Sequence, residues 1–127
     1  MKYVFDSNLL IYHFNNALSP HGQAILKDGL IHGAAVSIIT RIECLGYPCP
    51  EPALVVAQRL FDALIEIGLT DAIVNRTIQL RRQRKIKIPD AIVASTALSL
   101  DLPLVTRNVK DFHTIDDLTV IDPFADP

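Results

Sequence analysis

Five short apolar runs, separated by segments with helical periodicity, set the strongest constraint on how this chain folds. They are rich in β-branched and aromatic residues, which favour strands, and they cover residues 3–5, 34–38, 65–69, 104–105 and 118–121. A short, continuous apolar run is typical of a strand that is covered on both faces. Strands that alternate with helices indicate a parallel sheet with helices on both sides. The sequence therefore predicts an α/β fold of three layers with a central parallel sheet of about five strands.

The segments between these runs carry recognisable helix starts. Ser19 precedes Pro20, a pair that suits an N-cap followed by the first helical residue. Thr40 and Glu43 fit a capping box, in which the acid reaches back to the N–H of the capping residue. Pro89 begins a stretch of small apolar residues that predicts a tightly buried helix. The predicted helices cover 9–14, 20 to about 27 or 31, 40 onward, 51–65, 71 or 72 into the eighties and 89–98. Residues 106–112 are predicted to be a polar loop or short helix.

The length of 127 residues, with 50% hydrophobic and 20% charged residues, indicates one globular domain over 1–127. Disorder is expected only in the last few residues. The apolar run after Met1 and Lys2 is too short for a signal peptide, and no run approaches the roughly 18 residues of a membrane helix. A soluble, cytoplasmic protein is therefore expected. Cys44 and Cys49 have no Cys or His pair nearby to complete a zinc site, which favours reduced thiols.

The positive charges are concentrated in one segment. The whole chain has 12 basic and 14 acidic residues, a net charge of −2 that does not by itself suggest a nucleic-acid binder. Residues 76–87, however, hold six basic residues and no acid, so the other 115 residues carry a net charge of −8. This basic stripe can neutralise phosphates and attract a polyanion, although a run of charges is more often a solvated helix face. The candidate phosphate contacts are Arg81, Arg82, Arg84, Lys85, Lys87 and Arg107.

Acidic and amide side chains follow the predicted strands. Asp6, Glu43 and Asn108 come after three of the apolar runs, Asp90 begins the buried helix, and Asp111 lies three residues beyond Asn108. Strand ends and helix starts lie along one rim of an open α/β sheet, so these oxygen-bearing side chains are expected to share a pocket. A structural explanation stays open for two of them, because Asp6 can cap a helix and Glu43 can complete a capping box.

Carboxylates gathered in one pocket repel each other, and a divalent cation would remove that repulsion. Carboxylate, amide and water oxygens suit Mg²⁺ or Mn²⁺, and the candidate set holds no His or Cys to suggest zinc. An acid-lined metal site beside a basic stripe suggests hydrolysis of a phosphodiester bond. In that reaction either Asp6 or Asp90 could orient or deprotonate the attacking water.

Four sequence motifs carry a family resemblance: F-D-S-N at 5–8, T-R-I-E at 40–43, P-D-A-I-V-A at 89–94 and T-R-N-V-K-D-F at 106–112. In this order they resemble a PIN domain, specifically the toxin ribonuclease of a VapBC-type toxin–antitoxin pair, over nearly the whole chain. The resemblance implies five parallel strands in the order 3-2-1-4-5. It implies a Mg²⁺- or Mn²⁺-dependent endoribonuclease that cuts tRNA or mRNA and so inhibits translation. It also implies a protein that is often dimeric and is held inactive by a small antitoxin.

The same resemblance assigns roles to individual residues. Asp6, Glu43 and Asp90 would be the metal-binding acids, Asn108 would take the fourth position and the Ser7 hydroxyl would assist. Many family members have an acid where this chain has Asn108. An amide oxygen can bind a metal ion but adds no charge, so Asp111 is a candidate to substitute in part. We hypothesise that Asn108→Asp tightens metal binding.

Two other functions remain open on the sequence. A receiver-like domain also places acids around Mg²⁺, but it needs a Lys directly after a late strand, where this chain has Arg107. A non-catalytic member of the same fold could bind RNA or protein. The apolar residues of the 51–65 helix could serve a dimer, although the interpretation as core is preferred.

Overall fold

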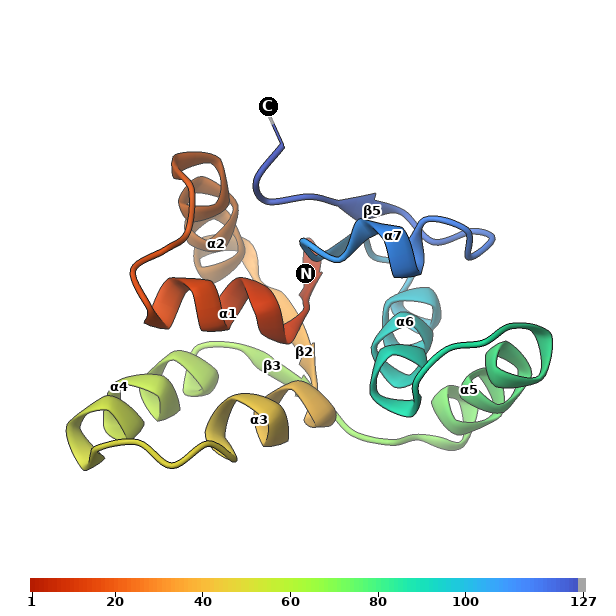
Figure 1. Cartoon of the computed structure of the whole chain (residues 1–127), viewed down its shortest axis with the longest axis horizontal. Coiled ribbons are helices and arrows are strands. Elements are labelled where there is room, and N and C mark those ends of the chain that lie inside the picture. The colour runs from red at the N-terminus through yellow and green to blue at the C-terminus, as the bar shows by residue number, and fades with distance from the viewer. Residues whose placement is uncertain (126–127) are drawn as a thin grey trace.

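Five parallel strands form one sheet in the computed structural model, which describes residues 1–125 (Figure 1). They are β1 (Tyr3–Phe5), β2 (Ala34–Ser37), β3 (Ile65–Ile67), β4 (Leu104–Val105) and β5 (Val120–Ile121). The strand order is β3-β2-β1-β4-β5, and every pair is parallel. The predicted α/β class and strand order are therefore confirmed. The chain reverses its direction of winding between β1 and β4, which makes the end of β1 the switch point of the sheet.

Seven helices accompany the strands in the described residues. They are α1 (Ser7–Phe14), α2 (Pro20–His32), α3 (Ile38–Leu45), α4 (Glu51–Asp62), α5 (Asp71–Gln83), α6 (Ile88–Leu100) and α7 (Val109–Phe112). The predicted start of α2 is confirmed, because the Ser19 hydroxyl accepts a hydrogen bond from the Gly22 N–H at 3.0 Å. Thr70 caps α5 in the same manner, with its Oγ1 3.2 Å from the Ile73 nitrogen.

The start of α3 corrects the sequence prediction. The helix begins at Ile38, and Ser37 is its N-cap, accepting from the Ile39 N–H at 3.2 Å. Thr40 is buried inside the helix and caps nothing, so the predicted capping box is wrong. Ser37 is the last residue of β2 and caps the helix directly, so Thr40, three residues later, already lies within the helix. Glu43 therefore lies in the interior of α3 and is free of the structural role that the motif suggested.

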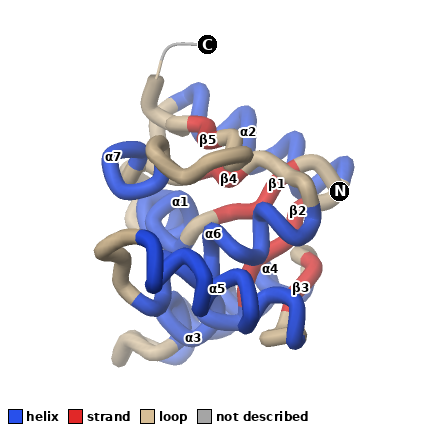
Figure 2. The backbone as a smooth tube through the Cα atoms, turned by 90° about the vertical axis from the view of Figure 1, so that its right-hand side faces the viewer, coloured by secondary structure: helices blue, strands red, loops and turns tan. Residues whose placement is uncertain are grey.

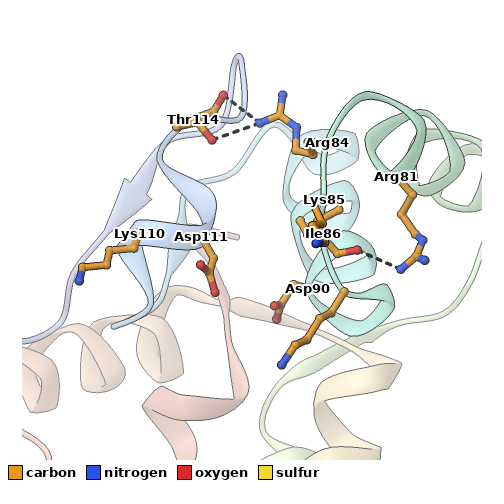
Figure 3. Close-up of a pocket in the computed structure, with 9 residues that line it drawn as sticks. Arg81, Arg84, Lys85, Ile86, Asp90, Lys110, Asp111 and Thr114 are labelled. Atoms are coloured by element: carbon orange, nitrogen blue, oxygen red, sulfur yellow. Dashed lines mark hydrogen bonds between the residues drawn. The ribbon is translucent and has the colours of Figure 1, made fainter.

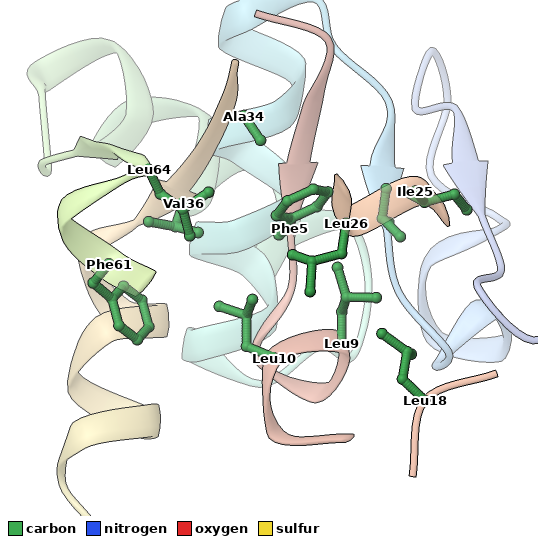
Figure 4. Packing of buried hydrophobic residues seen from close by; sticks show 11 residues of the cluster. Phe5, Leu9, Leu10, Leu18, Ile25, Leu26, Ala34, Val36, Phe61 and Leu64 are labelled. Carbon is green, nitrogen blue, oxygen red and sulfur yellow. The ribbon is translucent and has the colours of Figure 1, made fainter. Parts of the chain in front are cut away.

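The two faces of the sheet support two separate apolar clusters, as alternation along each strand requires. Phe5, Val36 and Val105 point to one face and pack with α1, α2 and α4. Figure 4 shows the side chains of this cluster converging around Phe5. Val4 and Leu104 point to the other face and pack with α5, α6 and α7. In Figure 1, α1, α2 and α4 lie on the left of the strands and α5 and α6 on the right, which gives the predicted three layers; Figure 2 views the molecule from the side of α5 and α6.

Two helix predictions can be checked against burial. Residues 91–97 of α6 are all buried, as the small apolar residues of this helix predicted. On α4, Ala57 and Phe61 are buried in the core while Val55 and Val56 are exposed. The apolar stripe of α4 therefore packs into the core, and Val55 and Val56 remain on the surface. Among residues 1–125 no helix is long and apolar enough to cross a membrane. Disorder was predicted for the last few residues, and residues 126–127 lie outside the part of the chain that the structure describes.

Candidate metal centre and adjoining cationic cleft

Asp6 occupies the switch point of the sheet. It follows β1 directly and is the N-cap of α1, with its Oδ1 accepting from the Ser7 N–H at 2.8 Å. The residue is only 5% exposed. Burial raises the pKa of this carboxyl group, while hydrogen bonds from Thr106 and Ser7 act to lower it. The capping role and the site role thus coexist in one side chain.

A hydrogen-bonded group around Thr106 holds the second oxygen of Asp6. The Thr106 hydroxyl donates to Asp6 Oδ2 at 2.8 Å and accepts from Asn8 Nδ2 and from the Asn108 N–H, both at 3.0 Å. Asn8 in turn accepts from the Arg107 N–H at 3.1 Å. These bonds join the β1–α1 junction to the loop after β4, so Asp6 is fixed from both sides.

Sequence reasoning did not assign roles to Thr106 and Asn8. One signal was available: Thr106 is the first polar residue after β4, as Asp6 is after β1. The two strands are neighbours in the sheet, so their following residues meet.

The structure places Glu43 and Asp90 near enough to Asp6 for its charge to act on both. Burial raises the pKa of the Glu43 carboxyl group, and the charges of Asp6 and Asp90 raise it further. Burial also raises the pKa of Asp90, with added contributions from Asp6 and Asp111. The charge of Asp6 therefore acts on both other acids, while the pKa of Asp6 itself is raised by burial. The Ser7 hydroxyl acts to lower the pKa of Glu43 and of Asp6.

Asn108 and Asp111 form the outer edge of this group. The Asn108 Nδ2 donates to Asp111 Oδ2 at 2.7 Å, which turns the two side chains toward each other. Figure 3 shows Asp111 facing Asp90 from the opposite side of the cleft. The five predicted metal ligands thus lie at one rim of the sheet. The amide of Asn108 is engaged with Asp111 in this arrangement.

The donor set suits a hard divalent cation. Its members offer only oxygen ligands. Burial is the main cause of the raised pKa values of Glu43 and Asp90, and neighbouring acids add a repulsion that a cation would relieve. Within residues 1–125, no three His, Cys, Asp or Glu side chains are close enough together to form a finished metal site. Cys44 lies beside the acids, and burial, with Glu43 and Asp6 nearby, raises the pKa of its thiol to about 12. A protonated thiol of this kind is a poor metal ligand.

A cleft of about 580 Å³ opens directly beside the acids. It is lined by Arg81, Arg84, Lys85, Ile86, Lys87, Asp90, Lys110, Asp111 and Thr114. Four of the predicted phosphate contacts belong to this lining, and Lys110 joins them although the sequence interpretation did not include it. Arg82 does not line the cleft. Arg107 is stacked on aromatic rings, 4.0 Å from the Phe124 ring centre and 5.2 Å from that of Tyr12.

Fold and site together define a class of protein: a three-layer α/β domain with acids at the switch point of a parallel 3-2-1-4-5 sheet, bordered by a cationic cleft. The sequence pattern of the PIN domain family matches residues 3–118, and the chain belongs to that family. This result disfavours a receiver-like domain, whose strand order is 2-1-3-4-5.

Solved structures with the same fold come from several bacteria. A toxin–antitoxin complex from Klebsiella pneumoniae has 29% sequence identity and a TM-score of 0.78, covering 97% of this chain and 98% of that chain. A DNA-bound VapBC from Salmonella typhimurium has 22% identity and a TM-score of 0.83, with coverage of 97% and 98%. VapBC2 from Rickettsia felis, bound to a promoter DNA fragment, has 21% identity and a TM-score of 0.79, with coverage of 95% and 98%. Comparison with curated proteins gave no match.

Proposed function

We propose that this chain is a metal-dependent endoribonuclease that acts in the cytoplasm as the toxin of a toxin–antitoxin pair. One observation carries the proposal: Asp6 and Asp90 lie near enough to Glu43 for their charges to raise its pKa, and Asp90 also lines a cleft with five basic residues. The acids would bind a metal ion, and the basic residues would bind a polyanion. The pairing of the two suits hydrolysis of a phosphodiester bond.

The residues that would hold Mg²⁺ or Mn²⁺ are Asp6, Glu43, Asp90 and Asn108, with Asp111 next to them. When bound, the ion supplies a Lewis acid that activates water and offsets charge on the leaving oxygen. Both oxygens of Asp6 are already engaged by Ser7, Asn8 and Thr106. Its part is therefore to bind and orient.

Asp90 is the better proton acceptor of the two candidates. No hydrogen bond from the described residues contributes to its pKa, so its carboxylate is available to a water molecule. We assign to Asp90 the removal of a proton from the attacking water.

The partners of the proposed toxin are an RNA, tRNA or mRNA, and a cognate antitoxin. The support for an antitoxin is that the similar proteins from Klebsiella and Salmonella were solved as toxin–antitoxin or VapBC complexes. Cleavage of such an RNA would inhibit translation. We also propose a homodimer, for which the exposed Val55 and Val56 on α4 provide apolar surface. Sedimentation of the purified chain, alone and coexpressed with a candidate antitoxin, tests both assemblies.

Cleavage of a total RNA pool tests the activity itself. Purified chain is incubated with Mg²⁺ or Mn²⁺, and wild type is compared with Asp6→Asn, with Asp90→Asn and with an EDTA control. Asp62→Asn, an exposed change on α4, is the matched control variant. Discrete fragments from wild type and Asp62→Asn alone support a metal-dependent nuclease. RNA retained without cleavage, by folded protein free of antitoxin, would instead indicate a non-catalytic binding module.

A further inference from the structure

The cationic cleft has two walls that come from distant parts of the chain. The first wall is the α5–α6 connection, with Arg84, Lys85 and Lys87. The second wall is α7 and the loop after it, with Lys110 and Thr114. Asp90 lies on the side of the first wall and Asp111 on the side of the second, facing each other across the cleft (Figure 3). A strand of nucleic acid in the cleft would thus meet cations from both sides.

The arginines of the cleft are occupied by protein groups. Arg84 Nη1 donates to the Thr114 carbonyl at 3.0 Å and to the Thr114 hydroxyl at 3.2 Å. Arg81 Nη1 donates to the Ile86 carbonyl at 2.9 Å and stays within the first wall. Among the side-chain hydrogen bonds and ion pairs of residues 1–125, those between Arg84 and Thr114 are the ones that join the two walls (Figure 3).

The lysines of the cleft, unlike its arginines, are not held by other groups of the described residues. Lys85, Lys87 and Lys110 are exposed, and none takes part in an ion pair within the part of the chain that the structure describes. Lys87 lies near enough to Asp90 to lower the pKa of that carboxyl group. Flexible ammonium groups suit a phosphate backbone, because they contact it as point charges without demanding one geometry.

We propose that Arg84 is a positioning residue that sets the distance between the two walls, and that Lys85, Lys87 and Lys110 are the phosphate contacts of the cleft. The inference rests on the proposed function for the class of ligand, a single-stranded RNA. It assigns to Arg84 the role of keeping Lys110 opposite Lys85 and Lys87. Without the Arg84 hydrogen bonds, the second wall moves and Lys110 no longer reaches the phosphates.

Salt dependence of RNA binding tests the lysines. Binding of a single-stranded RNA oligonucleotide is measured in EDTA, in an Asp6→Asn background that cannot cleave, at several salt concentrations. Each phosphate contact on a single strand contributes about 0.7 to the slope of log affinity against log salt. Lys85→Gln, Lys87→Gln and Lys110→Gln are each expected to reduce the slope by about that amount. Arg59→Gln, an exposed charge loss on α4, is the matched control and is expected to leave the slope unchanged.

The role of Arg84 is tested by combining variants. Arg84→Lys retains the charge, but its side chain ends one atom short of Nη1, the nitrogen that donates both hydrogen bonds to Thr114, so it is expected to behave like Arg84→Gln. Both variants should reduce the slope by about 0.7, the contribution of Lys110. Adding Lys110→Gln should then change nothing further, whereas adding Lys85→Gln, on the same wall as Arg84, should reduce the slope again.

Two results would overturn the inference. One is a wild-type slope for Arg84→Lys, which would make Arg84 a direct phosphate contact. The other is full additivity of Arg84→Gln with Lys110→Gln. Thermal unfolding confirms that each variant is folded. If Arg84→Gln does not fold, Thr114→Val, which removes one of the two acceptors, should give a smaller change in the same direction. Because cleavage plays no part in the measurement, failure of the nuclease proposal is recognised separately in the RNA-pool assay.

Discussion

A single hydroxyl group, that of Thr106, connects the parts of the candidate metal centre. It donates to Asp6 and accepts from Asn8 and from the Asn108 N–H. Thr106 is fully buried. Removing a buried partner leaves the remaining groups without hydrogen bonds, which costs about 1–3 kcal/mol. The hydroxyl also acts to lower the pKa of Asp6 and so favours the charged form that a cation needs.

Thr106→Val is therefore expected to lower the free energy of unfolding by about 1–3 kcal/mol and to weaken Mn²⁺ binding. Urea unfolding and calorimetric titration with Mn²⁺ measure the two effects. Thr96→Val is the matched control: Thr96 is equally buried, but its hydroxyl donates only to the Ile92 carbonyl of its own helix. Unaltered Mn²⁺ affinity in Thr106→Val would contradict the role given to this hydroxyl.

Asn108→Asp is expected to tighten Mn²⁺ binding on the order of ten-fold, or about 1.4 kcal/mol, and to destabilise the metal-free protein. The physical reason is that Asn108 now donates to Asp111 at 2.7 Å, and a carboxylate in its place would repel Asp111 until a cation binds both. Calorimetry and unfolding in EDTA test the two parts. Asn75→Asp, on the exposed side of α5, adds the same charge away from the site. Equal Mn²⁺ affinity in Asn108→Asp and wild type would sink the hypothesis.

At the scale of elements, the packing of α2 on β1 depends on Gly29. A Cβ at this position would lie 2.9 Å from Phe5 Cε2 and closer still to Cζ, and the Phe5 ring is fully buried. Gly29→Ala gains about 1 kcal/mol in helix propensity. Overpacking a rigid core costs about 1–3 kcal/mol, so a net loss of stability is expected. Thermal unfolding measures it, with Gly68→Ala as control because, apart from Gly68 and its two chain neighbours, no atom of residues 1–125 lies within 4 Å of a Cβ there. A more stable Gly29→Ala protein would show that the ring can move.

How far the elements could be predicted depended on whether their signals are local. The β1–α1 junction was readable, because three apolar residues end at Asp6 and a helical pattern follows. The start of α3 was misread, because Ser37 and Thr40 are both good caps and only pairing of Ser37 with Ile67 shows that the strand ends there.

The candidate site shows the same division between local and distant signals. Asp6 and Glu43 were identified from the strands that they follow, and Asp90 from its place at the start of a buried helix. The contact of Thr106 with Asp6 spans 100 residues, and no local pattern encodes it. The same holds for Lys110, which follows a short loop and becomes part of the cleft only when α7 packs near the α5–α6 connection. Strand order came from the family resemblance, since alternation of strands and helices fits several orders.

For the whole molecule, the acid cluster couples stability to pH. The pKa values of Asp6, Glu43 and Asp90 are raised in the folded protein, chiefly by burial. At a pH between the unfolded and folded pKa values, the folded state binds more protons than the unfolded state. The free energy of unfolding then falls as the pH rises through the raised values. Asp28 acts in the opposite direction, because hydrogen bonds from Lys2 and Tyr3 lower its pKa.

The metal-free protein is therefore expected to lose stability as the pH rises through the raised pKa values of the cluster, and Asp6→Asn is expected to lose less. Comparing the two proteins cancels the contribution of Asp28, which both share. A cation should reverse the loss, because it binds the ionised acids of the folded state. At 100 times its dissociation constant it would add about 2.7 kcal/mol to wild type. Urea unfolding from pH 5 to 8, in EDTA and in Mn²⁺, measures the loss of stability in wild type, the smaller loss in Asp6→Asn and the stabilisation by the cation. Parallel pH profiles for wild type and Asp6→Asn in EDTA would mean that burial does not raise the pKa of Asp6 in the folded protein. Equal stabilisation of both proteins by Mn²⁺ would place the ion elsewhere.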